Sequence, residues 1–266
     1  MTAPIEKYKV YAIKYAHHTR RATDNFLGGD SHDVAMPMDY FVWAVVGESR
    51  TFVVDTGFDA KGAEKRGRVI THSVESGLLQ LGINPDSVED VILTHMHYDH
   101  AGNGGLFPNA RYHVQDREMV YCTGRCMCHT TLSHPFEPDD IKGMVDRIFN
   151  GRVQFHNGSA SITSGLSVHW VGGHSDGLQV VRVYTDQGWI VLASDASHFY
   201  ANMDQNRPYP VVANVADMLE GFATIRRLSD SPAYVIPGHD PDVLRRFPAH
   251  DRETKDWIVR LDGALL

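Results

Sequence analysis

Short apolar runs bounded by polar residues recur along the chain of 266 residues. Their length, and their content of β-branched and aromatic residues, are typical of strands buried in a sheet. These runs predict strands at residues 8–16, 40–46, 51–54, 91–93, 111–114, 166–171, 179–185, 189–193 and 233–236.

Apolar residues at helical spacing occupy several of the stretches between these strands. One such stripe covers residues 141–149, and a second covers 215–225 with Asn214 as a candidate N-cap. A third helix is predicted at residues 73–81, where Gly82 provides a stop signal. The alternation of strands and helices predicts an α/β fold with helices on the outer faces of the sheets.

Length and charge limit the classes of protein to consider. No Pro/Ser-rich linker divides the sequence, so we expect one domain over residues 1–266. The formal net charge is −8, without a run of five like charges, which argues against a nucleic-acid partner. No apolar stretch approaches 18 residues, and residues 1–7 lack the apolar core of a signal peptide. We therefore expect a cytoplasmic protein without a membrane partner.

The three cysteines, Cys122, Cys126 and Cys128, lie in one short segment. An odd number of closely spaced cysteines is consistent with free thiols in a reducing compartment. Their spacing matches no common zinc motif. Because the segment follows the first histidine-rich loop, it is also a candidate lining of the substrate pocket.

The most informative chemistry lies at residues 94–100, which read Thr-His-Met-His-Tyr-Asp-His. His95, His97, Asp99 and His100 place four potential metal ligands within six residues, directly after a predicted strand. Imidazole nitrogens and carboxylate oxygens suit Zn²⁺ better than Mg²⁺ or Ca²⁺. Further candidate ligands follow other predicted strands, where loops gather at one end of a sheet: His174, Asp195 and His239.

These motifs, together with residues 53–57, make the chain resemble a metallo-β-lactamase-fold hydrolase, specifically the di-zinc N-acyl-homoserine lactonase group. The resemblance extends from Tyr11 to about Asp240. It implies a four-layer αββα sandwich that binds two Zn²⁺ ions per chain, although the same ligands can hold Fe, Mn or Co. It assigns His95, His97 and His174 to the first ion, Asp99, His100 and His239 to the second, and Asp195 to both.

The resemblance also implies an activity, namely the opening of a lactone ring by a hydroxide held between the two zinc ions. The substrate would be an acyl-homoserine lactone or a small aromatic or aliphatic lactone. Hydrolysis of a thioester, or of another cyclic ester or amide, is the alternative on the same site. A metal-binding protein without turnover is a third possibility, which a panel of lactones would distinguish. The oligomeric state stays open, and a dimer is compatible with the sequence.

The sequence departs from the lactonase group three residues after Asp195, where His198 replaces the Tyr expected there. We assign catalytic roles to Asp99 and to His198, with Tyr200 as a second candidate for contacting the substrate. The polar segment 17–38 is predicted to overhang the site, and it is long for a loop without function. Candidate pocket residues in and beside this segment are Phe26, Met36, Met38 and Tyr40.

Overall fold

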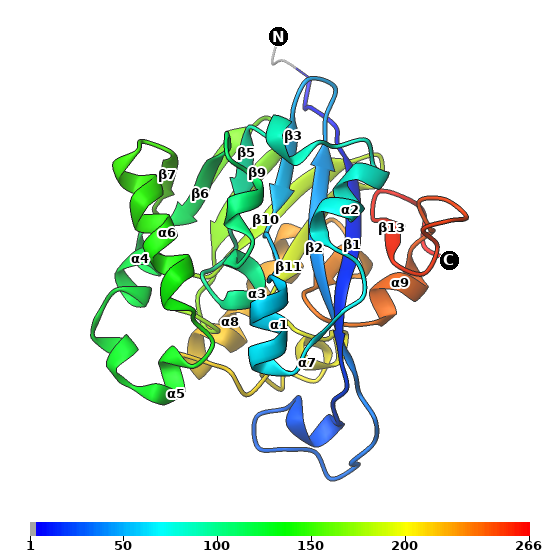
Figure 1. Ribbon diagram of the computed structural model, residues 1–266. Coiled ribbons are helices and arrows are strands. Elements are labelled where there is room, and N and C mark those ends of the chain that lie inside the picture. Colours follow the sequence, from blue (N-terminus) through cyan, green and yellow to red (C-terminus); the bar gives the residue numbers. More distant parts are fainter. Residues whose placement is uncertain (1–3) are drawn as a thin grey trace.

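Two β-sheets packed face to face, with helices on their outer sides, form the computed structural model, which describes residues 4–266 (Figure 1). The eight-stranded sheet has the spatial order β13 (Ile258–Arg260), β1 (Lys9–His18), β2 (Met38–Val46), β3 (Thr51–Val54), β5 (Asp90–Ile92), β6 (Arg111–Gln115) and β7 (Val153–His156), with β4 (Val69–Ile70) paired to β1. The five-stranded sheet has the order β12 (Val235–Pro237), β11 (Gly188–Ser194), β10 (Gln179–Thr185), β9 (Leu166–Trp170) and β8 (Ser159–Thr163).

The α-helices of the described residues are α1 (Ala60–Arg66), α2 (Val74–Gln80), α3 (Tyr98–Ala101), α4 (Asp116–Cys122), α5 (Thr130–Ser133), α6 (Pro138–Phe149), α7 (Tyr200–Asp204), α8 (Val215–Leu228) and α9 (Asp242–Arg246). Short 3₁₀ helices occur at Ala22–Asp24, Pro85–Ser87, Gly104–Leu106, Arg125–Cys128 and Pro232–Tyr234. Helices α1, α2 and α6 cover the larger sheet, and α8 covers the smaller one (Figure 1). Residues 4–266 contain no helix with the length and apolar character needed to span a bilayer.

The four-layer αββα arrangement follows from strands that are apolar on both faces. Along β1, Val10 and Ala12 join the core between the two sheets, whereas Ile13 and Tyr15 join the core beneath the outer helices. Successive side chains of a strand point to opposite faces, so such a strand contributes to two cores at once. The predicted α/β fold and its four layers are confirmed.

All the predicted strands are present, and no end is displaced by more than two residues. The predictions missed β4, β7, β8 and β13, and the reason lies in their positions. Strands β7, β8 and β13 each lie at an edge of a sheet, and β4 has two residues. Edge strands such as β7 and β8 are partly exposed and carry no continuous apolar run.

Helix α8 begins at the predicted N-cap and supports a neighbouring loop. The Asn214 side chain accepts hydrogen bonds from the backbone N–H groups of Ala216 (2.9 Å) and Asp217 (3.3 Å). The backbone N–H of Asn214 donates to the carbonyl of Gly173 at 2.9 Å. The start of α8 therefore holds the loop that follows β9.

We expect Asn214→Ala to lower the free energy of unfolding by about 1 kcal/mol, the usual cost of losing an N-cap. Asn214→Asp keeps an acceptor at the same position and should unfold within a few tenths of a kcal/mol of the wild type. Urea unfolding followed by circular dichroism measures both. Equal midpoints for the Ala and Asp variants would show that this cap adds no stability.

Candidate metal centre

The histidine and aspartate side chains singled out in the sequence lie at one edge of the two sheets, Asp99 and His100 in the short helix α3 and the others in loops. Strands β3 and β5 are parallel neighbours, as are β11 and β12. The carboxyl ends of parallel strands meet at the same edge, so the loops that follow them converge there. The loop after β5 carries His95 and His97, and the loops after β9, β11 and β12 carry His174, Asp195 and His239.

These side chains form two buried groups. The first group is His95, His97, His174 and Asp195, and the second is Asp99, His100 and His239. Each residue offers one candidate ligand atom, and within a group these atoms all lie within 4.8 Å of one another. Asp195 faces both groups. Its Oδ2 lies 3.1 Å from Nε2 of His174, while its Oδ1 lies 3.3 Å from Nε2 of His100 and 3.0 Å from Nε2 of His239.

The donor atoms of this cluster fit a metal ion. Among the buried atoms without a hydrogen bond in the described part of the chain are four that belong to these two groups: Nε2 of His95, His100 and His239, and Oδ1 of Asp195. Buried polar atoms are almost always paired, and each one left unpaired is costly. Imidazole nitrogen and carboxylate oxygen are donors that zinc and related divalent ions accept. The cluster therefore has the composition of a divalent-metal site.

Hydrogen bonds outside the cluster orient three of the imidazoles. In each of them Nδ1–H donates to an oxygen acceptor and Nε2 is directed to the cluster: His100 to the Asp55 carboxylate (2.7 Å), His174 to the Val211 carbonyl (2.7 Å) and His239 to the Asp39 carbonyl (3.0 Å). Such partners fix the tautomer and the ring orientation of metal-binding histidines. His97 differs, because its Nδ1 lies 2.9 Å from Nε2 of His174.

Asp55 is the buried carboxylate that connects His100 to the strands. It accepts hydrogen bonds from the backbone N–H (2.7 Å) and hydroxyl (2.8 Å) of Thr94. Asp55 and Ser194 both have positive φ angles, 62° and 46°, which side-chain-bearing residues rarely adopt. Strain of this kind persists where the surroundings hold it in place, and it concentrates at functional sites.

Glu118 is a second buried carboxylate, which the sequence analysis missed. It accepts hydrogen bonds from the backbone N–H of Met96 (2.8 Å), the hydroxyl of Ser175 (2.8 Å) and the backbone N–H of Gly177 (3.0 Å). A Cβ atom at Gly177 would collide with the backbone of Glu118. Glu118 thus joins the loop that carries His95 and His97 to the loop that carries His174.

Burial and mutual charge set the protonation of the cluster. Burial lowers the pKa of His95 and of His97 well below the usual range, so both rings are neutral with a free lone pair, as metal ligation requires. Burial also opposes the charging of His100, but the carboxylates of Asp195 and Asp55 raise its pKa well above the usual range. Burial opposes ionisation of Asp195 as well, yet the nearby imidazoles, first that of His198, hold its pKa well below the usual range.

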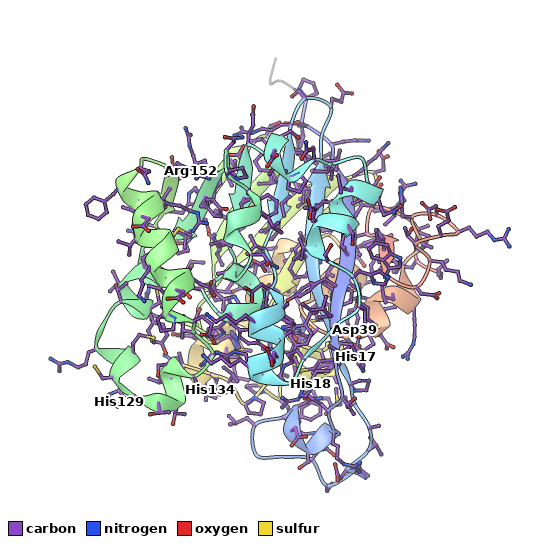
Figure 2. The ribbon with its side chains drawn as sticks, in the orientation of Figure 1. His17, His18, Asp39, His129, His134 and Arg152 are labelled. Carbon is purple, nitrogen blue, oxygen red and sulfur yellow. The ribbon has the colours of Figure 1, made fainter. Side chains whose placement is uncertain are left out.

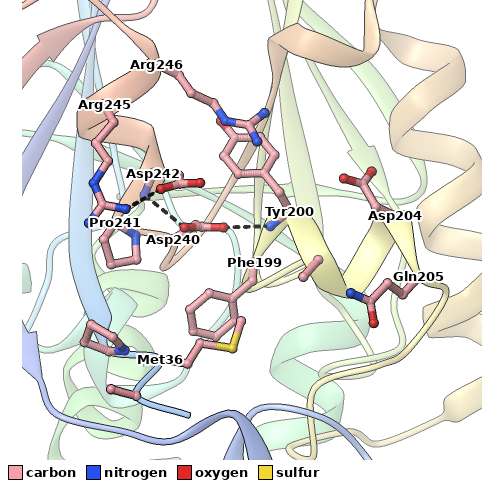
Figure 3. A pocket seen from close by; sticks show the side chains of 13 residues that line it. Met36, Phe199, Tyr200, Asp204, Gln205, Asp240, Pro241, Asp242, Arg245 and Arg246 are labelled. Carbon is pink, nitrogen blue, oxygen red and sulfur yellow. Dashed lines mark hydrogen bonds and ion pairs between the residues drawn. The ribbon is translucent and has the colours of Figure 1, made fainter. Parts of the chain in front are cut away.

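His198 and Tyr200 lie in different surroundings. Nε2 of His198 is 3.1 Å from Oδ2 of Asp195, and its ring stacks on Tyr209 with centroids 3.6 Å apart. Burial lowers the pKa of His198 to about 3, so the ring is neutral. Tyr200 instead lines a different cavity, of about 500 Å³, with the Arg246 guanidinium 3.6 Å from its ring centroid (Figure 3). Of the two catalytic candidates, His198 is the one that contacts the cluster.

A cavity of about 140 Å³ opens onto the cluster. Met38 and Tyr40 line it, as expected from the sequence. Met36 lines the larger cavity beside Tyr200, and Phe26 is buried with the Arg207 guanidinium 4.2 Å from its ring centroid. Side chains that the sequence analysis did not identify also line the smaller cavity: Arg20, Arg66, Arg68, Tyr98 and Tyr209.

The cysteine segment lies outside both cavities. Cys122 is buried, Cys126 is partly exposed, Cys128 is exposed, and all three are free thiols. None of them is among the residues that line the cavity over the cluster, where this part of the chain contributes His134 and Pro135 instead. The expectation that these cysteines line the pocket is therefore wrong.

Comparison with known proteins identifies the family. Residues 36–244 match the model of the metallo-beta-lactamase superfamily, and the chain belongs to that superfamily. The N-acyl homoserine lactonase AttM of Azorhizobium caulinodans is 30% identical over 183 residues, which are 63% of this chain and 64% of that protein. The N-acyl homoserine lactonase of Bacillus thuringiensis is 25% identical over 185 residues, 63% of this chain and 68% of that protein. The match thus spans less than two thirds of the Azorhizobium protein.

Solved structures share the fold. A quorum-quenching N-acyl homoserine lactone lactonase superposes with a TM-score of 0.72 at 21% identity, over 90% of this chain and 94% of that chain. An N-acyl homoserine lactone hydrolase, with its product N-hexanoyl-L-homoserine bound at the catalytic metal center, gives 0.73 at 20% identity over 91% and 96%. A probable metal-dependent hydrolase from Staphylococcus aureus gives 0.74 at 14% identity over 99% and 98%.

We expect Asp55→Asn to weaken metal binding by about 10- to 100-fold, because it removes the negative charge that orients His100. Competition with a chromophoric chelator measures the affinity. Asp90→Asn is the matched control, since Asp90 is equally buried and accepts from His113 Nε2 at 3.0 Å, outside the cluster. A loss of affinity as large in Asp90→Asn as in Asp55→Asn would indicate general destabilisation instead.

Proposed function

We propose that the protein is a hydrolase that binds two divalent metal ions and opens the ring of a lactone. The observation that carries the proposal is the position of Asp195, whose two carboxylate oxygens face different groups of buried histidines. A single carboxylate placed in this way can be shared by two ions. The N-acyl homoserine lactonases among the relatives support a lactone as the substrate.

The chain offers two sets of ligands for the ions. His95, His97 and His174 would hold the first, Asp99, His100 and His239 the second, and Asp195 both. Zn²⁺ matches these donors, and Fe, Mn or Co can use the same set. When bound, such ions lower the pKa of water and polarise a carbonyl group, and these are the two requirements for ester hydrolysis near neutral pH.

The residues of the chain set the charge and the geometry of the site. Asp99 and Asp195 contribute two negative charges, which offset half of the charge of two divalent ions. The remaining positive charge stabilises the oxyanion that develops when a carbonyl is attacked, and burial of the cluster strengthens that effect. This charge balance suits an ester and requires no nucleophilic side chain.

His198 positions Asp195 in this arrangement. With a neutral ring, Nε2–H donates to Oδ2 of Asp195, and stacking against Tyr209 fixes the plane of the imidazole. The proton of the neutral ring then lies on Nε2, which leaves Nδ1 as an acceptor directed away from Asp195. We therefore assign His198 to orienting the shared carboxylate. Tyr200, which lines the other cavity, is not needed for this role.

Elemental analysis of the wild-type protein should give two metal ions per chain. Asp195→Ala removes the shared carboxylate and should lower both the metal content and kcat, the latter by at least about 100-fold. Asp186→Ala, at a side chain 74% exposed, is the control that should change neither quantity. A wild-type content of one ion under metal-replete conditions, or full activity in Asp195→Ala, would contradict the proposal.

His198→Ala should retain two metal ions but slow lactone opening by about 10- to 100-fold, in line with the loss of an outer-shell partner. His198→Tyr places a hydroxyl donor at the same position and should recover part of the activity. Tyr200→Phe should keep wild-type kcat and KM, because Tyr200 lines a different cavity. The variants are compared by steady-state kinetics and elemental analysis. A wild-type rate in His198→Ala, or a slow Tyr200→Phe, would reverse the assignment.

A further inference from the structure

The cavity over the metal cluster carries an unusual number of guanidinium groups. Arg20, Arg66 and Arg68 all line it, and they come from the segment after β1 and from the end of α1. The carboxylates among its lining residues are Asp99 and Asp195, both part of the cluster itself. Arginine is therefore the only lysine- or arginine-type cation among the lining residues of the cavity.

Arg66 is neutralised by the protein. Its side chain is 8% exposed, and Nη2 lies 2.6 Å from Oε1 of Glu137 and donates to the carbonyl of His134 at 2.9 Å. The guanidinium also lies 4.0 Å from the ring centroid of Tyr98. Within the described residues, its buried Nε makes no hydrogen bond. Arg66 thus forms a fixed wall of the cavity with one donor left unpaired.

Arg68 and Arg20 make hydrogen bonds to neutral groups. Arg68 donates through Nε to the hydroxyl of Tyr98 (3.2 Å) and through Nη1 to Nε2 of His18 (3.1 Å). Burial, followed by the charge of Arg68, lowers the pKa of His18 to about 4, so His18 accepts as a neutral ring. Arg20 donates through Nε to the side-chain oxygen of Asn25 at 2.7 Å.

The two arginines are thereby oriented without being neutralised. No carboxylate of residues 4–266 lies within ion-pair distance of either guanidinium. His18 and His134, the neighbours of Arg68 and Arg66, lie at the same end of the molecule (Figure 2). Arginine presents a planar fork of donors that matches an oxyanion, and a charged acceptor makes the stronger hydrogen bond.

We propose that the substrate is a small lactone that carries a carboxylate, which Arg68 and Arg20 bind while the ester faces the cluster. This inference rests on the proposed lactonase function and specifies its substrate class. A neutral acyl-homoserine lactone would leave both guanidinium groups without an ion-pair partner. The cavity of about 140 Å³ is also smaller than the roughly 300–1,000 Å³ typical of sites for drug-sized ligands.

The reaction is addition of one water across the acyl C–O bond of the ring. The acyl carbon gains the water oxygen, the ring oxygen takes one proton and becomes a hydroxyl, and the new carboxylic acid loses its proton. The product is a hydroxy-dicarboxylate. Its second negative charge forms at the cluster, while the first stays at the arginines, so the two charges lie at opposite ends of the product.

The direct test compares γ-butyrolactone-γ-carboxylate with its neutral carboxamide. The wild type should prefer the carboxylate by about 10- to 100-fold in kcat/KM, the scale of one hydrogen bond to a charged group. Arg68→Gln should lower kcat/KM for the carboxylate at least about ten-fold more than for the carboxamide, and Arg20→Gln should act in the same direction. Arg252→Gln, at an exposed arginine outside the cavity, should leave both values unchanged.

Binding of tetrahydrofuran-2-carboxylate, which has no ester to hydrolyse, provides a readout independent of turnover. Calorimetry on the metal-loaded protein should show binding that weakens in Arg68→Gln and is absent with the carboxamide. If neither lactone is hydrolysed but this binding depends on Arg68, the lactonase function fails and the anion subsite stands. Equal hydrolysis of both lactones, unchanged in Arg68→Gln, would overturn the inference and leave the lactonase function intact. Stronger competition by inorganic phosphate than by acetate would overturn the choice of a carboxylate.

Discussion

The carboxylate of Asp195, held between two groups of buried imidazoles, is the interaction on which the rest of the site depends. Its position requires an irregular pairing of β11 with β12, whose register shifts between Leu192 and Ser194. It also requires Ser194 at a φ of 46° and a glycine at 238, where a Cβ atom would lie 2.5 Å from Oδ1 of Asp195. A positive φ at Ser194, the last residue of β11, and the absence of a side chain at Gly238, directly after β12, therefore allow one carboxylate to face both groups.

The candidate ligands could be picked out from the sequence because each one lies next to a local signal. Four of them occur within six residues after a strand, and each of the others follows a predicted strand. The alternation of strands and helices predicted the α/β class, whereas the four-layer arrangement followed from the resemblance to the metallo-β-lactamase fold. Edge strands such as β7 and β8 were missed because partial exposure leaves no apolar pattern.

The residues that surround the ligands could not be predicted in this way, because their roles arise from contacts between distant segments. Glu118 acts through Ser175, 57 residues away, and Arg68 through His18, 50 residues away. No spacing rule relates such pairs. Tyr209 likewise gains its role by stacking on His198 from a loop without secondary structure. Relatives at about 20% identity share the scaffold. The shared fold does not fix the residues that line the cavity. A difference in substrate between this chain and those proteins would therefore arise from the cavity lining.

The hydrogen bonds of Glu118 limit which segments of this site can be exchanged for those of another member of the superfamily. Because one buried carboxylate joins the loop of His95 and His97 to the loop of His174, these loops form a single unit. A chimera that imports one of them from another member of the superfamily would leave an ionisable group buried with too few donors. Crossovers should therefore be tolerated when α4 and both loops come from the same parent. In this chain, helix α4 and the two loops would then be exchanged together, although the three segments are separated in sequence.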